Sequence, residues 1–234
     1  MTWWYAVVEA KHELQNPTSA DKIRLLGERL ELGPSSCVLD IASGKGGPAR
    51  ILAGEFGCRL TCVERAPEFV EVARERAGER IDVTEADAAE FEIQPGYDAA
   101  LCLGASFVYG GLVRTLEALK PAAPLVAVGE PYWREWPLPD GFDPHEDEQA
   151  WLPLPETVAL AESSGVRVVS LIDSSRDDWD RYETLHWLAL DEWLAANPDA
   201  PEADEFRERG LRNRERYLRR DRDLLGWAIF VCRT

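Results

Sequence analysis

The strongest constraint on the fold lies at residues 37–52, where an apolar run breaks into a glycine-rich turn and then resumes with another period. The apolar residues within 38–41 have the composition of a buried strand, whereas those within 51–56 recur at helical spacing. Between them, Gly44 and Gly46 let the chain turn sharply and let a ligand approach the backbone. We expect unpaired amides of this turn, at the start of the following helix, to face a bound ligand.

Two acids end neighbouring apolar runs and indicate what this ligand is. Asp40 closes the run before the glycines, and Glu64 closes the run at 60–63. Consecutive parallel strands end at the same edge of a sheet, so both carboxylates are expected at the edge where open α/β folds bind ligands. A carboxylate there can accept hydrogen bonds from ribose hydroxyls, each worth about 1.5–3 kcal/mol. The pattern therefore predicts a nucleoside site.

The same glycines also match the dinucleotide pattern G-x-G-x-x-[GA] over residues 44–49. An NAD(P)-dependent oxidoreductase that uses this loop is therefore an alternative function. Asp40 argues against it, because a carboxylate in the mouth of the loop repels a pyrophosphate. The same carboxylate suits an ammonium or sulfonium ligand.

Residues 40–46 resemble the first motif of the class I S-adenosylmethionine (SAM) dependent methyltransferases, acid-x-Gly-x-Gly-x-Gly, with Ala42 in place of the first glycine. The acids and glycines from 37 to 129 follow the spacing of that family. Three further segments resemble a bacterial subgroup of methyltransferases of unknown substrate: 129–134, 179–183 and 193–198. The resemblance spans nearly the whole chain.

This resemblance implies an α/β fold, a Rossmann-like seven-stranded, mostly parallel sheet in the order 3-2-1-4-5-7-6, with helices on both faces. The last two strands are expected at 166–172 and 227–232, and the long segment between them implies a helical insertion. We therefore expect one methyltransferase domain over 1–234, made of a helical cover at 1–33, a SAM-binding core at 34–130, a lid loop at 131–155 and a helical insertion at 177–225.

By the same resemblance, the cofactor is SAM and the product S-adenosylhomocysteine. Glu64 is expected to hold the ribose, Asp87 and Ala88 the adenine, and Leu103 and Gly104 to lie under the sulfur. Asp87 has an alternative role as the N-cap of a short helix at 88–91. The full set expected at the cofactor is Asp40, Ala42, Ser43, Gly44, Gly46, Glu64, Arg65, Asp87, Ala88, Leu103 and Gly104.

The expected reaction is in-line transfer of a methyl group to a small-molecule acceptor. Candidate catalytic residues are Glu130 and His186 as a general base and Tyr132 as an aromatic contact of the sulfonium. His186 would lie on an inserted helix, where a structural histidine is the alternative. A SAM-binding sensor or interaction module without transferase activity is a further alternative, since the lid and the insertion could also serve a partner.

The composition of the chain excludes several classes of binding partner. The net charge of −17 argues against nucleic acid, because phosphate binding needs clustered cations. We expect no membrane partner, because no apolar stretch approaches the ~18 residues of a membrane span, and no signal peptide, because the N-terminus lacks a basic segment and a long apolar core. The five cysteines have no zinc-type spacing, so we expect reduced thiols, a cytoplasmic location and no bound metal. Composition does not address the oligomeric state.

Overall fold

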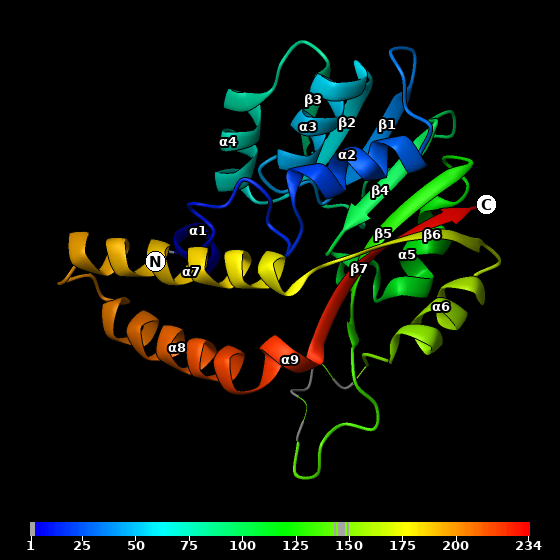
Figure 1. Ribbon diagram of the computed structural model, residues 1–234. Helices are drawn as coiled ribbons and strands as arrows, with labels where there is room; N and C mark the ends of the chain where they lie inside the picture. Colours follow the sequence, from blue (N-terminus) through cyan, green and yellow to red (C-terminus); the bar gives the residue numbers. More distant parts are fainter. Residues whose placement is uncertain (1–2, 143, 145–147, 149) are drawn as a thin grey trace.

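One mixed sheet organises the residues that the structure describes, which are 3–142, 144, 148 and 150–234. In this computed structural model the strand order is β3-β2-β1-β4-β5-β7-β6 (Figure 1), which confirms the predicted order. β7 is antiparallel to β5 and β6, and the remaining pairs are parallel. The strands are β1 (Cys37–Ile41), β2 (Arg59–Glu64), β3 (Ile81–Glu85), β4 (Ala99–Leu103), β5 (Leu125–Trp133), β6 (Arg167–Asp173) and β7 (Leu225–Arg233).

Helices cover both faces of the sheet because its central strands are apolar on both sides. Val38 packs in the cluster that contains α2 and α3, and the next residue, Leu39, packs in the cluster that contains α5 and α6. None of the described helices is both long and apolar enough to cross a membrane. The helices are α1 (Trp4–Val8), α2 (Ala20–Arg29), α3 (Gly47–Phe56), α4 (Pro67–Arg76), η1 (Ser106–Tyr109), α5 (Leu112–Leu119), α6 (Leu154–Glu162), α7 (Arg176–Ala196), α8 (Ala203–Arg216), η3 (Tyr217–Asp221) and α9 (Arg222–Leu224).

β5 is longer than its apolar sequence indicates. Its pairing with β7 continues through residues 131–133, which the sequence assigned to the lid loop. Of the remaining loop, Phe142 and Trp151 pack on Trp133, and the Arg220 guanidinium lies 4.6 Å from the Phe142 ring centre. At Phe142 the loop therefore contacts both the end of β5 and the end of the helical insertion. Its role as a lid stays a prediction, and residues 143, 145–147 and 149 lie outside the described part.

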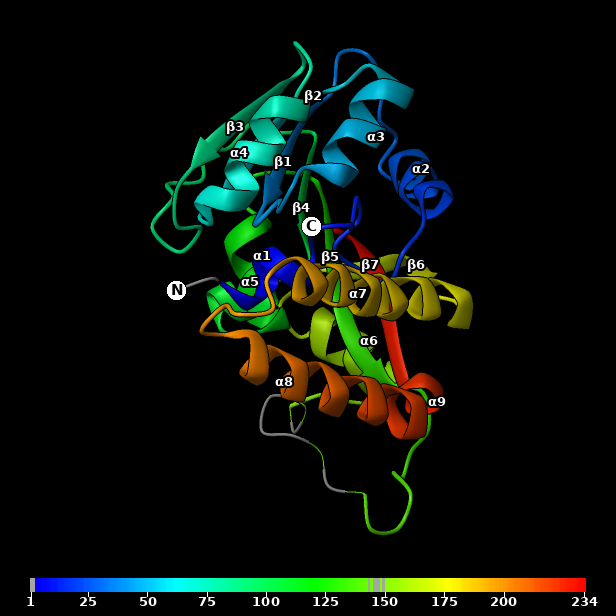
Figure 2. The same cartoon turned by 90° about the vertical axis from the view of Figure 1, so that its left-hand side faces the viewer.

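The helical insertion between β6 and β7 forms an antiparallel pair of helices, α7 and α8 (Figure 1). The short N-terminal helix α1 lies against both (Figure 2): Trp4 packs edge to face on Phe206 of α8, and Val7 and Val8 share a buried cluster with Leu190 of α7. The N-terminus and the insertion, which lie far apart in the sequence, thus form one layer.

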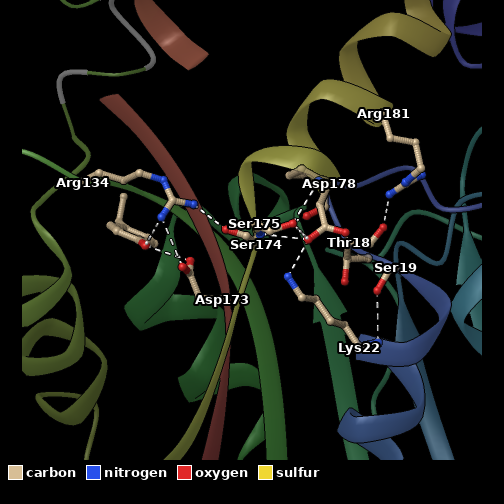
Figure 3. Close-up of polar contacts among 11 residues, drawn as sticks. Thr18, Ser19, Lys22, Arg134, Asp173, Ser174, Ser175, Asp178 and Arg181 are labelled. Atoms are coloured by element: carbon tan, nitrogen blue, oxygen red, sulfur yellow. Dashed lines mark hydrogen bonds and ion pairs between the residues drawn. The ribbon is translucent and has the colours of Figure 1, made fainter. Parts of the chain in front are cut away.

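A partly buried polar network joins the start of α7 to the start of α2 and to the residues just before it (Figure 3). Lys22 Nζ lies 2.5 Å from Asp178 Oδ2, and the Arg181 guanidinium donates to the Thr18 carbonyl oxygen. The Asp178 carboxylate also accepts from the Ser175 amide at 2.8 Å, while the Ser175 hydroxyl accepts from the Asp178 amide, so the two form a capping box. Arg134 adds a bond from its guanidinium to the Ser174 carbonyl oxygen at 2.5 Å.

We expect Asp178→Ala to lower the free energy of unfolding by about 1–3 kcal/mol, because it removes both the helix cap and a largely buried ion pair. Burial opposes ionisation of Asp178, but the hydrogen bonds from Lys22 and Ser175 outweigh it and hold its pKa below the usual range. The difference between wild type and variant should therefore shrink as the pH falls below about 4. Urea denaturation at several pH values measures this difference in the free energy of unfolding. Asp177→Ala, at an exposed neighbour in the same turn, is the control; equal losses in both variants would contradict the role of Asp178.

Candidate active site

A cavity of about 830 Å³ lies at the carboxyl ends of β1, β2 and β4. It is bounded by the glycine turn after β1, the start of α4, the turns after β3 and β4, and the N-terminal segment. All of the residues predicted to hold SAM line it except Gly46 and Asp87, which are absent from the described lining. The cavity therefore lies at the edge of the sheet where the sequence predicts ligand binding.

Asp40 and Glu64 lie at the same end of the sheet, as predicted. In the parallel pairing, Asp40 lies opposite Cys62, so Glu64 ends its strand two residues further on. Asp40 is buried, and among the described residues its Oδ2 has no hydrogen-bond partner. Burial, together with the nearby charge of Glu64, raises the pKa of Asp40 to about 7. Since an unsatisfied buried carboxylate oxygen is costly, a cation or donor on a ligand would stabilise Asp40.

Glu64, in contrast, is well satisfied by the backbone. Its carboxylate accepts hydrogen bonds from the amides of Gly44, Arg65 and Ala66 at 2.9, 2.9 and 2.8 Å. It therefore ties the glycine turn to the start of α4. Two carboxylate oxygens offer about four acceptor positions, so Glu64 keeps capacity for a ligand hydroxyl.

The prediction of unpaired amides in the glycine turn is wrong for residues 43–46. The Ser43 amide donates to the Val63 carbonyl oxygen, the Gly46 amide to the Ser43 carbonyl oxygen, and the Lys45 amide to Gln15 Oε1 at 2.7 Å. Gly44 is held by Glu64, as above. What the turn offers a ligand is instead the buried Ser43 hydroxyl, which has no partner in the described part of the chain.

Ala42 occupies a left-handed backbone conformation, with φ of 53°. This explains why the motif has glycine at that position, because a Cβ in this region costs about 1–2 kcal/mol. The methyl group of Ala42 lines the cavity. The departure from the motif therefore leaves the turn intact but strained.

The N-terminal segment lines part of the cavity, and no local pattern in the sequence indicates that its residues lie there. Gln15 and Asn16 both line the cavity, and Asn16 Nδ2 donates to the Leu103 carbonyl oxygen at 3.0 Å. A Cβ on Gly44 would come within 2.2 Å of Gln15 Oε1, and one on Gly104 within 2.1 Å of Asn16 Oδ1. The positive φ angles favour glycine at both positions, and a larger residue at either would also force the end of Gln15 or Asn16 to move.

Glu9 and Tyr182 also line the cavity, opposite the strand ends. Glu9 is buried, and its Oε1 lies 2.9 Å from His186 Nε2 and 3.1 Å from the Tyr182 hydroxyl. Burial lowers the pKa of His186, but its interactions with Glu183 and Glu9 outweigh burial and raise it to about 9. His186 is outside the described lining and reaches the cavity through Glu9. Burial lowers the pKa of the neighbouring His12.

The other predicted catalytic residues lie outside the described cavity lining. Burial raises the pKa of Glu130 to about 7, against a lowering by its hydrogen bond with Ser106. The Tyr132 hydroxyl donates to Asp173 Oδ1 at 2.8 Å, and Tyr132 borders a different hollow of about 430 Å³. The catalytic roles of Glu130, Tyr132 and His186 stay predictions.

The two predicted cofactor residues missing from the lining have other contacts. The glycine Cα of Gly46 faces Ala73 of α4. Asp87 Oδ1 accepts from the Ala89 amide at 2.9 Å, and Asp87 Oδ2 lies 3.6 Å from Arg65 Nη1. Asp87 therefore closes a turn; the short helix considered for 88–91 does not form.

Comparison with known proteins agrees with this geometry. Residues 38–126 match the family described as Methyltransferase domain. The uncharacterised protein YjhP of Escherichia coli (strain K12) is 31% identical over 242 residues, covering 97% of this chain and 96% of that protein.

Two solved structures extend the similarity to the fold. A SAM-dependent methyltransferase from Thiobacillus denitrificans, in complex with S-adenosylhomocysteine, has a TM-score of 0.91 and 30% identity, covering 100% of this chain and 99% of that one. A SAM-dependent methyltransferase from Geobacter sulfurreducens, also in complex with S-adenosylhomocysteine, has a TM-score of 0.89 and 31% identity. The match covers 99% of this chain and 98% of that one. The fold, the glycine turn with its two acids and this similarity over the full length agree: the chain belongs to the SAM-dependent methyltransferase family.

Proposed function

We propose that the protein is an enzyme that transfers a methyl group from SAM to a small-molecule acceptor by in-line displacement. The observation that carries this proposal is the pair of buried carboxylates, Asp40 and Glu64, beside the glycine turn in one cavity. The two solved relatives with S-adenosylhomocysteine, similar over almost their full length, support the choice of cofactor.

The polar groups of the cavity fit SAM. The sulfonium and ammonium charges of SAM suit the ionised form of Asp40, and the Ser43 hydroxyl is free to bond a ligand. Glu64 would accept from the ribose hydroxyls, with Ala88 beside the adenine and Leu103 and Gly104 under the sulfur. When bound, SAM supplies the electrophilic methyl group, and the chain's part is to align the two reactants and exclude water.

The size and lining of the cavity favour a small acceptor. Its volume of about 830 Å³ falls within the roughly 300–1,000 Å³ of small-molecule sites. Aromatic side chains from three elements form its rim: Trp3 and Phe69, whose ring centres are 5.0 Å apart, and the exposed Phe107. Such a rim can cover an apolar acceptor while the reacting centre stays in the interior.

The state of the cysteines fits a reducing compartment. All five are free thiols in the structure, and four of them are buried. Because disulfides form readily in oxidising compartments, we infer a cytoplasmic location for the enzyme.

Binding and turnover test the proposed function. We expect SAM to bind with a dissociation constant in the micromolar range by calorimetry, because the cavity offers a buried carboxylate to a cationic ligand. Incubation with methyl-labelled SAM and a set of small molecules should then move label to an acceptor. Heat with NAD(H) and none with SAM would overturn the cofactor; binding without any transfer would favour a sensor.

We expect Glu64→Ala to weaken SAM binding at least tenfold, about 1.4 kcal/mol, through the loss of ribose hydrogen bonds. The substitution also releases the three amides that Glu64 holds, so folding of the variant is checked by its thermal transition. Calorimetry measures the affinity. Glu55→Ala, at an exposed acid on α3, is the matched control. Unchanged affinity in a folded Glu64→Ala protein would remove Glu64 from the site.

Asp40→Asn should stabilise the SAM-free protein while weakening SAM binding. The folded-state pKa of about 7 exceeds the unfolded value of about 3.9, so wild-type stability falls as the pH rises between these values. The variant lacks the ionisable group and so avoids this loss. We expect its free energy of unfolding to exceed that of wild type by about 1–3 kcal/mol at pH 8 and by less at pH 5.5. Thermal melts at both pH values measure it, with the exposed Asp82→Asn as control. A variant that melts lower than wild type at pH 8 would contradict the assignment.

A further inference from the structure

Three side chains that can bind metals meet at the wall of the cavity. Glu9 and His12 come from the segment after α1, and His186 comes from α7. One potential ligand atom from each lies within 4.8 Å of the other two. Glu9 and His12 are buried, and the His186 side chain is 19% exposed. His186 lies more than 170 positions after Glu9 and His12 in the sequence, so no metal-binding motif with a fixed spacing indicates this cluster.

The hydrogen bonds of His12 determine which of its nitrogens is available. His12 Nε2 lies 2.9 Å from the backbone carbonyl oxygen of Tyr182, which can only accept. Nε2 therefore carries the hydrogen of the neutral ring, and Nδ1 presents a lone pair. Nδ1 lies 3.3 Å from Glu9 Oε2, and within the described ranges neither atom has a hydrogen-bond partner. Two buried lone pairs thus face one another, an arrangement that a cation between them would stabilise.

We propose that Glu9, His12 and His186 bind a divalent first-row transition metal ion, with Zn²⁺ as the reference ion. Zinc at about 2.1 Å from tetrahedral donors sets the donors about 3.4 Å apart. The distance from Glu9 Oε2 to His12 Nδ1, 3.3 Å, lies close to that value. His186 Nε2 lies 2.9 Å from Glu9 Oε1 in a hydrogen bond, whose proton the metal ion would replace. Two imidazoles and one carboxylate are a donor set that zinc uses with a further position left open.

The surrounding groups match those around a metal ligand. A ligating histidine donates its other N–H to a carbonyl or carboxylate. His12 donates to the Tyr182 carbonyl oxygen. His186 Nδ1 has the Glu183 carboxylate nearby, at 3.9 Å, which is an ion-pair distance rather than a hydrogen bond. The Tyr182 hydroxyl orients Glu9 through its bond to Oε1. Lys45 Nζ lies 2.5 Å from the backbone carbonyl oxygen of Glu9 and bonds to it rather than to the carboxylate.

An ion here goes beyond the proposed methyl transfer and does not depend on it. It would join the N-terminal segment to α7 at the cavity wall, because its ligands come from both. Since Glu9 and Tyr182 also line the cavity, the ion would border the space in which SAM and the acceptor are proposed to bind. In that position it could orient an oxygen or nitrogen of a bound molecule.

Metal titration of the untagged protein, stripped with chelator and then dialysed, tests the site without SAM or acceptor. We expect Zn²⁺ to bind at one ion per chain in the micromolar range or tighter by calorimetry, and Co²⁺ to give a visible absorption band. His12→Gln and His186→Gln should each weaken binding at least tenfold. His145→Gln replaces the remaining histidine of the sequence, which lies outside the described residues, and should leave binding unchanged.

Folding and binding are separated by two further measurements. Zn²⁺ in excess should raise the melting temperature of wild type, and Glu9→Gln, which preserves shape, should abolish that rise even where a histidine variant does not fold. Zinc binding that is absent, that requires millimolar ion, or that survives in the His12, His186 and Glu9 variants would overturn the proposal. Binding lost only in His145→Gln would overturn it as well. SAM calorimetry on the same protein reports separately on the proposed function.

Discussion

This site depends on two carboxylates at one edge of the sheet. The fold supplies hydrogen bonds to one of them and leaves an oxygen of the other without a partner among the described residues. Glu64 receives three backbone amides and so fixes the glycine turn and the start of α4. Asp40 is buried with one oxygen lacking a partner among the described residues, which costs stability. The rest of the fold offsets that cost, since strands buried on both faces and the long β5–β7 pair place the edge within an extensive apolar core. A cation bound beside Asp40 would remove this cost, so the arrangement favours a cationic ligand.

The second constraint is the contact between the chain's N-terminal segment and the glycines. The ends of the Gln15 and Asn16 side chains occupy the space that a Cβ at Gly44 or Gly104 would need, so the segment packs directly on the glycine positions. The Lys22–Asp178 pair fixes the end of this segment to α7. Because α7 also supplies Tyr182 to the cavity, the insertion is part of the site wall, although it lies far from the motif in the sequence.

Local features of the sequence predicted the glycine turn and the edge of the sheet that carries the two acids, and the family resemblance predicted the strand order. A strand and a helix flank the glycine turn, as the apolar spacing on either side of it predicts, and Asp40 and Glu64 share one edge because parallel register requires it. The failures have long-range causes. The turn amides are paired because Gln15 and Glu64 reach them, and β5 extends past its apolar run because β7 pairs with it. The cluster of Glu9 with two histidines exists only once α1 and α7 are packed together, which no local pattern encodes.

The electrostatics of Asp40 also bear on the direction of the proposed reaction. With its pKa near 7, the carboxyl exchanges a proton readily in the empty cavity, and a cation beside it favours the ionised form. SAM carries a sulfonium charge that the sulfur of S-adenosylhomocysteine lacks. Under the proposed function, methyl transfer removes the sulfonium charge and leaves the product with only its ammonium charge. The buried carboxylate of Asp40 would therefore attract the product less strongly than SAM.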